Sequence, residues 1–364
     1  SGRSHFGSRL AQVGAETLQQ MASVTMLEGN VLEGCPTAEA TSEQVECIAQ
    51  SERARNLKVC SDATAIREAA PSWLVWPLLA ALPLALTAGA PRYRDIFPVH
   101  WYDEEPIAHP GLGLASWRAV KPLGLCLGLL AVTVGQGFVI AYHALRRWQC
   151  LGRTVRIQDQ DRPYDLMEGI QTHLAQPEGF VLLGGYLAGS WMFGLMPASY
   201  YAFGGGLNWL HVAVQLLLQD GLQYCMHVGE HKVSSWIYRH SHKPHHRFTN
   251  PRIFDAFNGS LADTLLMVVA PLAMTAQLCQ TVNVWSYMAF GSVYAGWLVL
   301  IHSEYAHPWD ALFRFLRFGT PADHHVHHRL FTFNYGHLFV FWDKIFGTYR
   351  DPRSYRGTYF SKEL

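Results

Sequence analysis

The sequence predicts an all-α integral membrane protein, a transmembrane helical bundle capped by a histidine-rich domain on the cytosolic side. Only 15% of the 364 residues are charged and 49% are hydrophobic, whereas a soluble domain usually carries about 25% charged residues. Thirteen of the 19 histidines lie between His227 and His337, among long apolar runs. The runs predict membrane-spanning helices, and the histidine cluster predicts a metal-binding region beside them.

The charges balance, with 28 Lys plus Arg and 28 Asp plus Glu. A chain without net positive charge lacks the electrostatic surface that recruits nucleic acid, so nucleic-acid binding is excluded as a function. The seven cysteines show no Cys-x-x-Cys and no paired spacing. This argues against a disulfide framework or a zinc ribbon and favours a reducing compartment.

Residues 1–70 are expected to form a weakly ordered cytosolic tail, because they are rich in Ala, Ser, Glu and Gln and contain no long apolar run. The stretch Arg3-Ser-His-Phe-Gly-Ser-Arg9 resembles a trans-spliced messenger leader read through as protein. It predicts that residues 1–20 are translated leader and that translation begins at Met21. A basic, serine-containing organelle transit peptide is the alternative.

Residues 71–226 are expected to form transmembrane helices, since a span needs about 20 mostly apolar residues. Four uncharged runs meet or approach this length, at residues 73–90, 122–142, 179–203 and 204–219. The last run is short, so a buried helix is the alternative there.

Residues 227–364 hold the histidine boxes together with one more apolar element. Residues 264–301 contain no charge, and a single helix of that length would measure about 57 Å, nearly two bilayer cores. We therefore expect a membrane hairpin at 264–301 that turns near residues 280–283.

The loop cations predict the orientation of the bundle. Lys and Arg are frequent in residues 144–178, in residues 227–263 and after His302, whereas the loop 91–121 contains the acidic run Asp103-Glu-Glu105. The first three segments are therefore expected on the cytosolic side, which puts all the histidine boxes on one face of the membrane.

The histidines occur as four elements, His227-Val-Gly-Glu-His231, His242-Lys-Pro-His245-His246, His302 and His324-His325-Val-His327-His328. Residues three or four apart lie on one face of a helix, so each box can aim two or three imidazoles at one point. A single box would be a weak signal, because an isolated histidine is more often a hydrogen-bonded core residue. Eight or nine neutral imidazoles exceed the four to six ligands of one ion, so two metals are predicted.

Imidazole suits iron, zinc, copper and nickel, so the ligand type does not name the metal. A metal pair at the edge of an apolar bundle suits the oxidation of a lipid by dioxygen, which needs a redox metal. Zinc does not change its oxidation state. Two iron ions are therefore favoured, with zinc expected in some purified material. A di-zinc hydrolase is the alternative, although no paired carboxylates lie among the boxes.

From about residue 216 to residue 352 the chain resembles the fatty acid hydroxylase superfamily, the group of sterol desaturases, methylsterol oxidases and alkylglycerol monooxygenase. The resemblance rests on the boxes with their flanks at 236–248 and 320–328, on Asn334-Tyr-Gly336 and on residues 341–348. Membrane acyl desaturases separate their first two boxes by some tens of residues, whereas ten residues separate His231 from His242 here. The chain departs from the family in Val228-Gly-Glu230, where an arginine usually follows the first histidine.

The resemblance implies nine metal ligands that are also the catalytic residues: His227, His231, His242, His245, His246, His302, His324, His327 and His328. His240 stays open between ligand, hydrogen-bond donor to a ligand and surface residue, and His325 and His337 stay open between ligand and hydrogen-bond partner, while His307 is expected to be structural. Asp323, Asp343, Glu304 and Asp263 are the candidate acceptors for the second N–H of a ligating imidazole. For Asp343 a helix cap or a surface ion pair is the alternative.

The resemblance further implies a membrane-bound non-haem di-iron oxygenase of the endoplasmic reticulum that uses O2 to hydroxylate or desaturate a lipid. Its electrons would come from cytochrome b5 or a similar carrier with an NAD(P)H reductase, since the sequence contains no dinucleotide fingerprint. A sterol is the favoured substrate, as in sterol C5-desaturase or methylsterol oxidase. A fatty acyl, sphingolipid or alkylglycerol hydroxylase is the alternative, and a non-catalytic membrane subunit with a structural metal site is the second.

Overall fold

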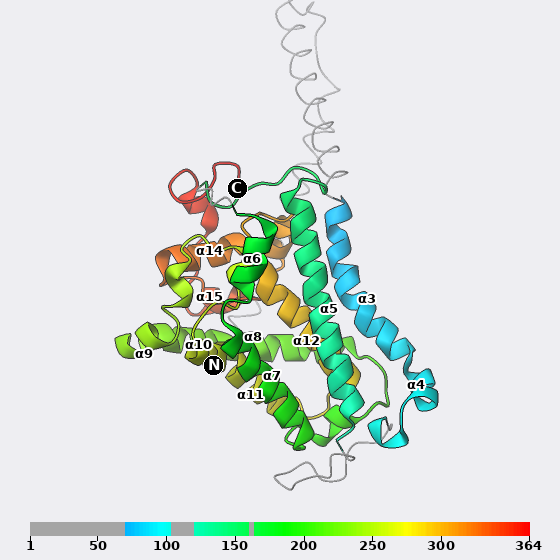
Figure 1. The fold of residues 1–364 in the computed structure, drawn as a ribbon. Coiled ribbons are helices and arrows are strands. Elements are labelled where there is room, and N and C mark those ends of the chain that lie inside the picture. The colour runs from blue at the N-terminus through cyan, green and yellow to red at the C-terminus, as the bar shows by residue number, and fades with distance from the viewer. Residues whose placement is uncertain (1–69, 103–119, 160–163) are drawn as a thin grey trace, which may run out of the picture. The chain divides into compact units, whose positions relative to one another are not determined.

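The computed structural model describes residues 70–102, 120–159 and 164–364 (Figure 1). The chain divides into a unit of residues 1–64 and a unit of residues 65–364, and the second contains every described residue. The predicted tail, the predicted leader and the acidic run at 103–105 lie outside the described residues.

The described residues confirm the predicted all-α membrane class. They form helices and contain no β-strand beyond isolated bridges. Within the described part, three helical segments are long and apolar enough to cross a membrane, at 70–88, 122–147 and 261–278. The helix Val284–Leu300 is equally apolar but shorter.

Helices α3 (Val75–Ala88), α5 (Pro122–Arg147) and α12 (Val284–Leu300) pack together, with α3 and α5 along one side of the molecule (Figure 1). Small residues allow the close approach of α5 and α12. A Cβ atom at Gly135 would lie 2.7 Å from Oγ of Ser292, which is closer than van der Waals contact permits. Leu79 of α3 is buried between them, against Gly135 and Gly296.

The structure corrects the predicted element at 179–203, which is not one long helix. Helix α7 (Pro177–Met192) ends eleven residues earlier, and a 3-10 turn (Ala198–Tyr201) follows. Gly194, Gly205 and Gly206 have positive φ angles of 67°, 80° and 64°, a conformation that ends helices and that glycine adopts at little cost. Hydropathy alone does not register these breaks, because residues 193–208 are as apolar as the helices beside them.

Helix α8 (Trp209–Lys232) replaces the short predicted element at 204–219. It begins after Asn208, whose side chain accepts the N–H of Leu210, a regular N-cap. It continues without a break past residue 226, where the predicted domains divide, and carries His227 and His231 on its last turns. The division into domains itself stays a prediction.

Two apolar helical segments follow one another between residues 261 and 300. The first consists of α10 (Leu261–Asp263), a π-helical turn (Thr264–Val269) and α11 (Ala270–Leu278), and the second is α12. The link at 279–283 coincides with the predicted turn, and Asn283 caps α12 by accepting the N–H of Ser286. The shorter elements are α4 (Ala90–Ile96), α6 (Leu166–His173), α9 (Ser235–His240), α13 (Asp310–Phe315), α14 (Pro321–Leu330), α15 (Phe341–Ile345) and 3-10 turns at Ala70–Leu74, Val99–Trp101, His245–Arg247, Ile253–Asp255 and Pro352–Tyr355.

Candidate metal centre

Four segments bring their histidines together at one end of the bundle: the last turns of α8, the turn at 242–246, the residue after the C-cap of α12, and α14. Helix α14 is fixed at its start by a capping box. Thr320 Oγ1 accepts the N–H of Asp323, and the Asp323 carboxylate accepts the N–H of Thr320 at 3.0 Å. This cap orients the helix so that the three predicted ligands on α14 are all buried.

The imidazole nitrogens form two groups. Within each group the ligand atoms lie within 4.8 Å of one another. All nine predicted ligands belong to one or the other: the first group is His227, His231, His242, His246 and His327, and the second is His245, His302, His324 and His328. Two adjacent groups of five and four imidazoles match the expected number of two ions.

The hydrogen bonds at the outer nitrogens fix the protonation state of several rings. Nδ1 of His227 donates to the carbonyl of Tyr335 at 2.7 Å, and Nδ1 of His242 donates to Asp263 at 2.7 Å. In a neutral imidazole the other nitrogen is then a lone-pair acceptor. His327 and His328 donate in the same way to the carbonyls of Phe333 and Phe248, so the inner nitrogens of these four rings are free to bind a cation.

Burial keeps these imidazoles neutral. It lowers the pKa of His242 to about 3 and that of His245 to about 4, because a charged ring loses its hydration in the interior. Metal ligation requires the neutral ring. A donor set made of imidazole nitrogens suits Fe, Zn, Cu or Ni and does not suit Mg or Ca. The residues therefore fit two transition-metal ions.

The four predicted acceptors behave differently from one another. Asp263 accepts from a ligand, His242. Asp343 acts one step further out, since its carboxylate accepts the N–H groups of Tyr335 and Gly336, both at 2.8 Å, and so holds the turn whose carbonyl binds His227. Asp323 caps α14, and Glu304 accepts from Tyr164 and from the backbone N–H of Ile253.

The four remaining histidines of this region lie outside both groups. His240 is exposed, and its Nδ1 bonds to the carbonyl of Trp236. His325 is buried and ties α14 to neighbouring segments, with Nε2 donating to the carbonyl of Ser303 at 3.0 Å and Nδ1 accepting from Gln158 at 2.9 Å. His307 bonds to Tyr142.

His337 lies between the two groups, with its ring centre 5.1 Å from that of His227 and 4.9 Å from that of His324. Its Nδ1 is buried and has no hydrogen-bond partner among the described residues. It is therefore adjacent to both groups and a member of neither.

Two acidic residues of α8 contribute to the site and were not predicted. Asp220 is buried, and its carboxylate accepts the N–H groups of Leu338 at 2.7 Å and Phe339 at 3.0 Å, which fixes the backbone beside His337. Glu230 lies 3.8 Å from Nδ1 of His242, and burial, with Asp263 nearby, raises the pKa of Glu230 to about 9. Asp220 is the only charge in residues 204–226, a signal that marks functional or structural acids in apolar helices.

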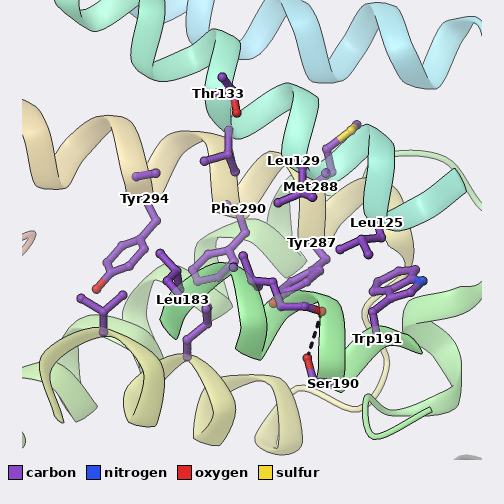
Figure 2. A pocket seen from close by; sticks show the side chains of 18 of the residues that line it. Leu125, Leu129, Thr133, Leu183, Ser190, Trp191, Tyr287, Met288, Phe290 and Tyr294 are labelled. Carbon is purple, nitrogen blue, oxygen red and sulfur yellow. Dashed lines mark hydrogen bonds between the residues drawn. The ribbon is translucent and has the colours of Figure 1, made fainter. Parts of the chain in front are cut away.

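One cavity adjoins the histidine groups, and a second shares part of its lining. The smaller, of about 40 Å³, is lined by His242, His245, His302 and His337. The larger, of about 240 Å³, lies between α5, α7 and α12 and is lined mostly by apolar and aromatic side chains (Figure 2). Phe257, Val268 and Leu298 line both cavities, so an apolar space lies next to the histidine-lined one.

Fold and site together define a helical membrane protein with two adjacent buried histidine groups that could each hold a metal ion. The fatty acid hydroxylase family matches residues 212–348. A protein of Phaeodactylum tricornutum described as alternative squalene epoxidase is 54% identical over 295 residues, 80% of this chain and 82% of that protein. The chain belongs to the fatty acid hydroxylase superfamily, as its motifs predicted.

More distant relatives include sterol enzymes. A lathosterol oxidase of Rattus norvegicus is 32% identical over 169 residues, which is 41% of this chain and 50% of that protein. A Delta(7)-sterol 5(6)-desaturase of Aspergillus fumigatus is 25% identical over 273 residues, 72% of this chain and 74% of that protein. No solved structure matches the chain. These relatives make the chain a member of a family of lipid oxidoreductases.

Proposed function

We propose that the protein is an O2-dependent di-iron oxygenase that epoxidises squalene at a double bond. The observation that carries this proposal is the pair of imidazole groups, beside a small cavity that shares lining residues with a larger apolar one, in a chain that shares 54% identity with an alternative squalene epoxidase over four fifths of its length. The overall reaction consumes the alkene, O2, two electrons and two protons, and yields the epoxide and water. Iron bound by the two groups would supply the activation of O2.

The protein's own residues hold and shield that centre. Asp263 and the carbonyl of Tyr335 fix the rings of His242 and His227 by their Nδ1 atoms, so the inner nitrogens point at a fixed position. His324, His327 and His328 are each at most 1% exposed, and such burial excludes bulk water from the reaction.

A sterol is the second candidate substrate, the one that the sequence motifs favoured. The box His242-Lys-Pro-His245-His246 resembles that of sterol C5-desaturases, and two sterol enzymes are among the relatives. One structural observation also favours it. The hydroxyl of Tyr287 is buried beside the larger cavity and has no hydrogen-bond partner among the described residues, and a sterol hydroxyl would satisfy it.

We propose further that the histidine groups face the cytosol at the endoplasmic reticulum and receive electrons from cytochrome b5 or a similar carrier. The loop cations support this orientation. Tags placed after Leu364 and within residues 159–164 should be accessible from the cytosol, and a tag within residues 103–109 should be protected.

The test uses the full chain, purified in nanodiscs, loaded with Fe(II) and supplied with cytochrome b5 and its reductase. It is incubated under ¹⁸O2 with squalene and, separately, with a Δ7-sterol. We expect an epoxide of squalene that carries one labelled oxygen atom. A modified sterol with unchanged squalene would overturn the epoxidation and support the second candidate. No product from either, with two irons bound, would support the non-catalytic alternative.

A further inference from the structure

We propose that the larger cavity is the binding channel for a linear hydrocarbon, which enters from the bilayer and advances end-first along α12 to the group of four histidines. This inference rests on the proposed function, because it specifies how a substrate without a polar head would reach the metal centre. It assigns the channel wall, the entry side and the histidine group at which the chain end arrives.

One face of α12 forms the wall of the channel. Tyr287, Phe290, Tyr294 and Leu298 line the cavity, and the next residue at this spacing is His302. Steps of three or four residues keep side chains on one face of a helix, and 15 residues span about 22 Å. The rings stack along this face, at 6.1 Å between Tyr287 and Phe290 and 5.7 Å between Phe290 and Tyr294. Figure 2 shows the row facing Leu125 and Leu129 of α5.

The wall leads to one histidine group in particular. Phe257, Val268 and Leu298 line both cavities, so the two cavities are neighbours with these side chains at their shared boundary. The smaller cavity is bounded by His245 and His302, which both belong to the group of four. Leu298 contacts both the cavities and the group of four histidines. It lines both cavities, and its carbonyl accepts the Nδ1–H of His302 at 2.8 Å.

The wall is aromatic, and its polar atoms are largely satisfied within the protein. The hydroxyl of Tyr294 accepts from Gln219 at 3.0 Å and donates to Gln223 at 2.9 Å. Ser190 donates to the carbonyl of Leu187. The hydroxyl of Tyr287 is the exception described above. A ligand here therefore gains mainly by burial of apolar surface, which is the chemistry of an unfunctionalised chain.

The size and the edge of the cavity indicate how such a chain would sit. Pockets that enclose drug-sized ligands have volumes of about 300–1,000 Å³, whereas this cavity measures about 240 Å³. A long polyisoprenoid therefore fits only in part. Leu129 lines the cavity and is 40% exposed on α5, a candidate membrane span, so the remainder of the chain can stay in the lipid.

The glycines of the two walls provide matched variants. A Cβ atom at Gly128 of α5 or at Gly184 of α7 would meet nothing within 4 Å, and both residues line the cavity. Gly137 of α5 and Gly185 of α7 have equally open surroundings and do not line it. A leucine at the first two positions starts from an open Cβ position and obstructs the cavity, and a leucine at the other two starts from an equally open position away from it.

The experiment compares the full-length wild type with Gly128→Leu, Gly184→Leu, Gly137→Leu and Gly185→Leu, all iron-loaded in nanodiscs. Each protein is labelled with a polyisoprenoid alkene that carries a terminal diazirine, the cross-linked peptides are identified by mass spectrometry, and squalene turnover and iron content are measured. We expect cross-links to α12 and the smaller cavity that fall at least about tenfold in both cavity variants, with unchanged iron. The two outer variants should stay within about twofold of the wild type.

The outcomes separate this inference from the proposed function. Squalene turnover with unchanged cross-linking and unchanged rates in both cavity variants would overturn the channel and leave the epoxidation standing. Cross-links that depend on Gly128 and Gly184 without any epoxide would support the channel and overturn the epoxidation. If one cavity variant loses iron, the cross-linking and turnover of the other variant test the channel, because Gly128 and Gly184 lie on different helices.

Discussion

His227 and His242 face each other with their Nε2 atoms 2.9 Å apart, while each ring donates its Nδ1–H to another acceptor. Both Nε2 atoms therefore carry lone pairs, and no hydrogen lies between them. Two such nitrogens repel each other in a buried site unless a cation lies close to both. The geometry of this pair therefore suits a metal ion, and we expect the fold and such a metal to stabilise each other.

Metal removal should therefore destabilise the protein. At about 100 times the dissociation constant, a ligand specific to the native state adds about 2.7 kcal/mol to the free energy of unfolding. We expect chelation of iron to lower the Tm and readdition to restore it, measured by thermal unfolding in nanodiscs. A Tm that does not respond to iron would contradict the inference from His227 and His242.

Replacing one ligand in each group tests the division into two groups. His245→Ala and His327→Ala each delete one coordinating nitrogen without altering the apolar helices that drive insertion. We expect each variant to lose turnover and to retain about one of two irons, measured by metal analysis and activity. His240→Ala is the control, because His240 is exposed and outside both groups. Full activity of either ligand variant would exclude a di-iron centre here.

Asp263 should affect metal binding mainly through its hydrogen bond to His242. Loss of an acceptor behind a ligating histidine typically lowers metal affinity by about 10- to 100-fold. Asp263→Asn keeps the size of the side chain and removes its charge, so we expect weaker iron binding within that range, measured by competition with a chelator. Glu178→Gln, on the first turn of α7, should leave the affinity unchanged. An Asp263→Asn protein with wild-type affinity would mean that the contact is only structural.

The pH dependence of the metal-free protein follows from its buried imidazoles. Burial lowers the pKa of His242 to about 3 and that of His245 and His325 to about 4, from an ordinary 6.5. Between these values the unfolded chain binds protons that the folded protein does not, so the free energy of unfolding falls as the pH drops from 6.5 toward 4. Above pH 6.5 these histidines do not change the free energy of unfolding with pH.

Denaturant unfolding of the metal-free protein across this range measures the effect. His325 lies outside both metal groups, so His325→Gln should reduce the slope and leave the iron content unchanged. A stability that increases on acidification would show that the folded protein protonates these rings first.

The sequence allowed the nine clustered histidines to be predicted because their spacing follows helix geometry, and their role as ligands stays a prediction. It allowed the link near 280–283 to be predicted because residues 264–301 are too long for one span. The division of the apolar runs between residues 203 and 204 lies next to the break at Gly205 and Gly206, whereas the break at Gly194 was missed, since hydropathy is insensitive to φ. Thr320-x-x-Asp323 could have been recognised as a capping box, which would have removed Asp323 from the acceptors. The cavity could not be predicted, because it depends on how three helices pack.

The N-terminal segment should be dispensable for the metal centre. All nine imidazoles belong to the unit of residues 65–364. A variant that lacks residues 1–64 should therefore keep its iron and its turnover, measured on equal amounts of inserted protein.

A variant that also lacks α3 provides the contrast. Leu79 of α3 is 1% exposed and lies 3.3 Å from the Cβ position of Gly296 on α12, the helix that ends just before His302. Loss of Leu79 together with α3 leaves a cavity between α5 and α12, so this second variant should lose iron. Loss of iron in the first variant, with insertion intact, would mean that the N-terminal segment supports the metal centre.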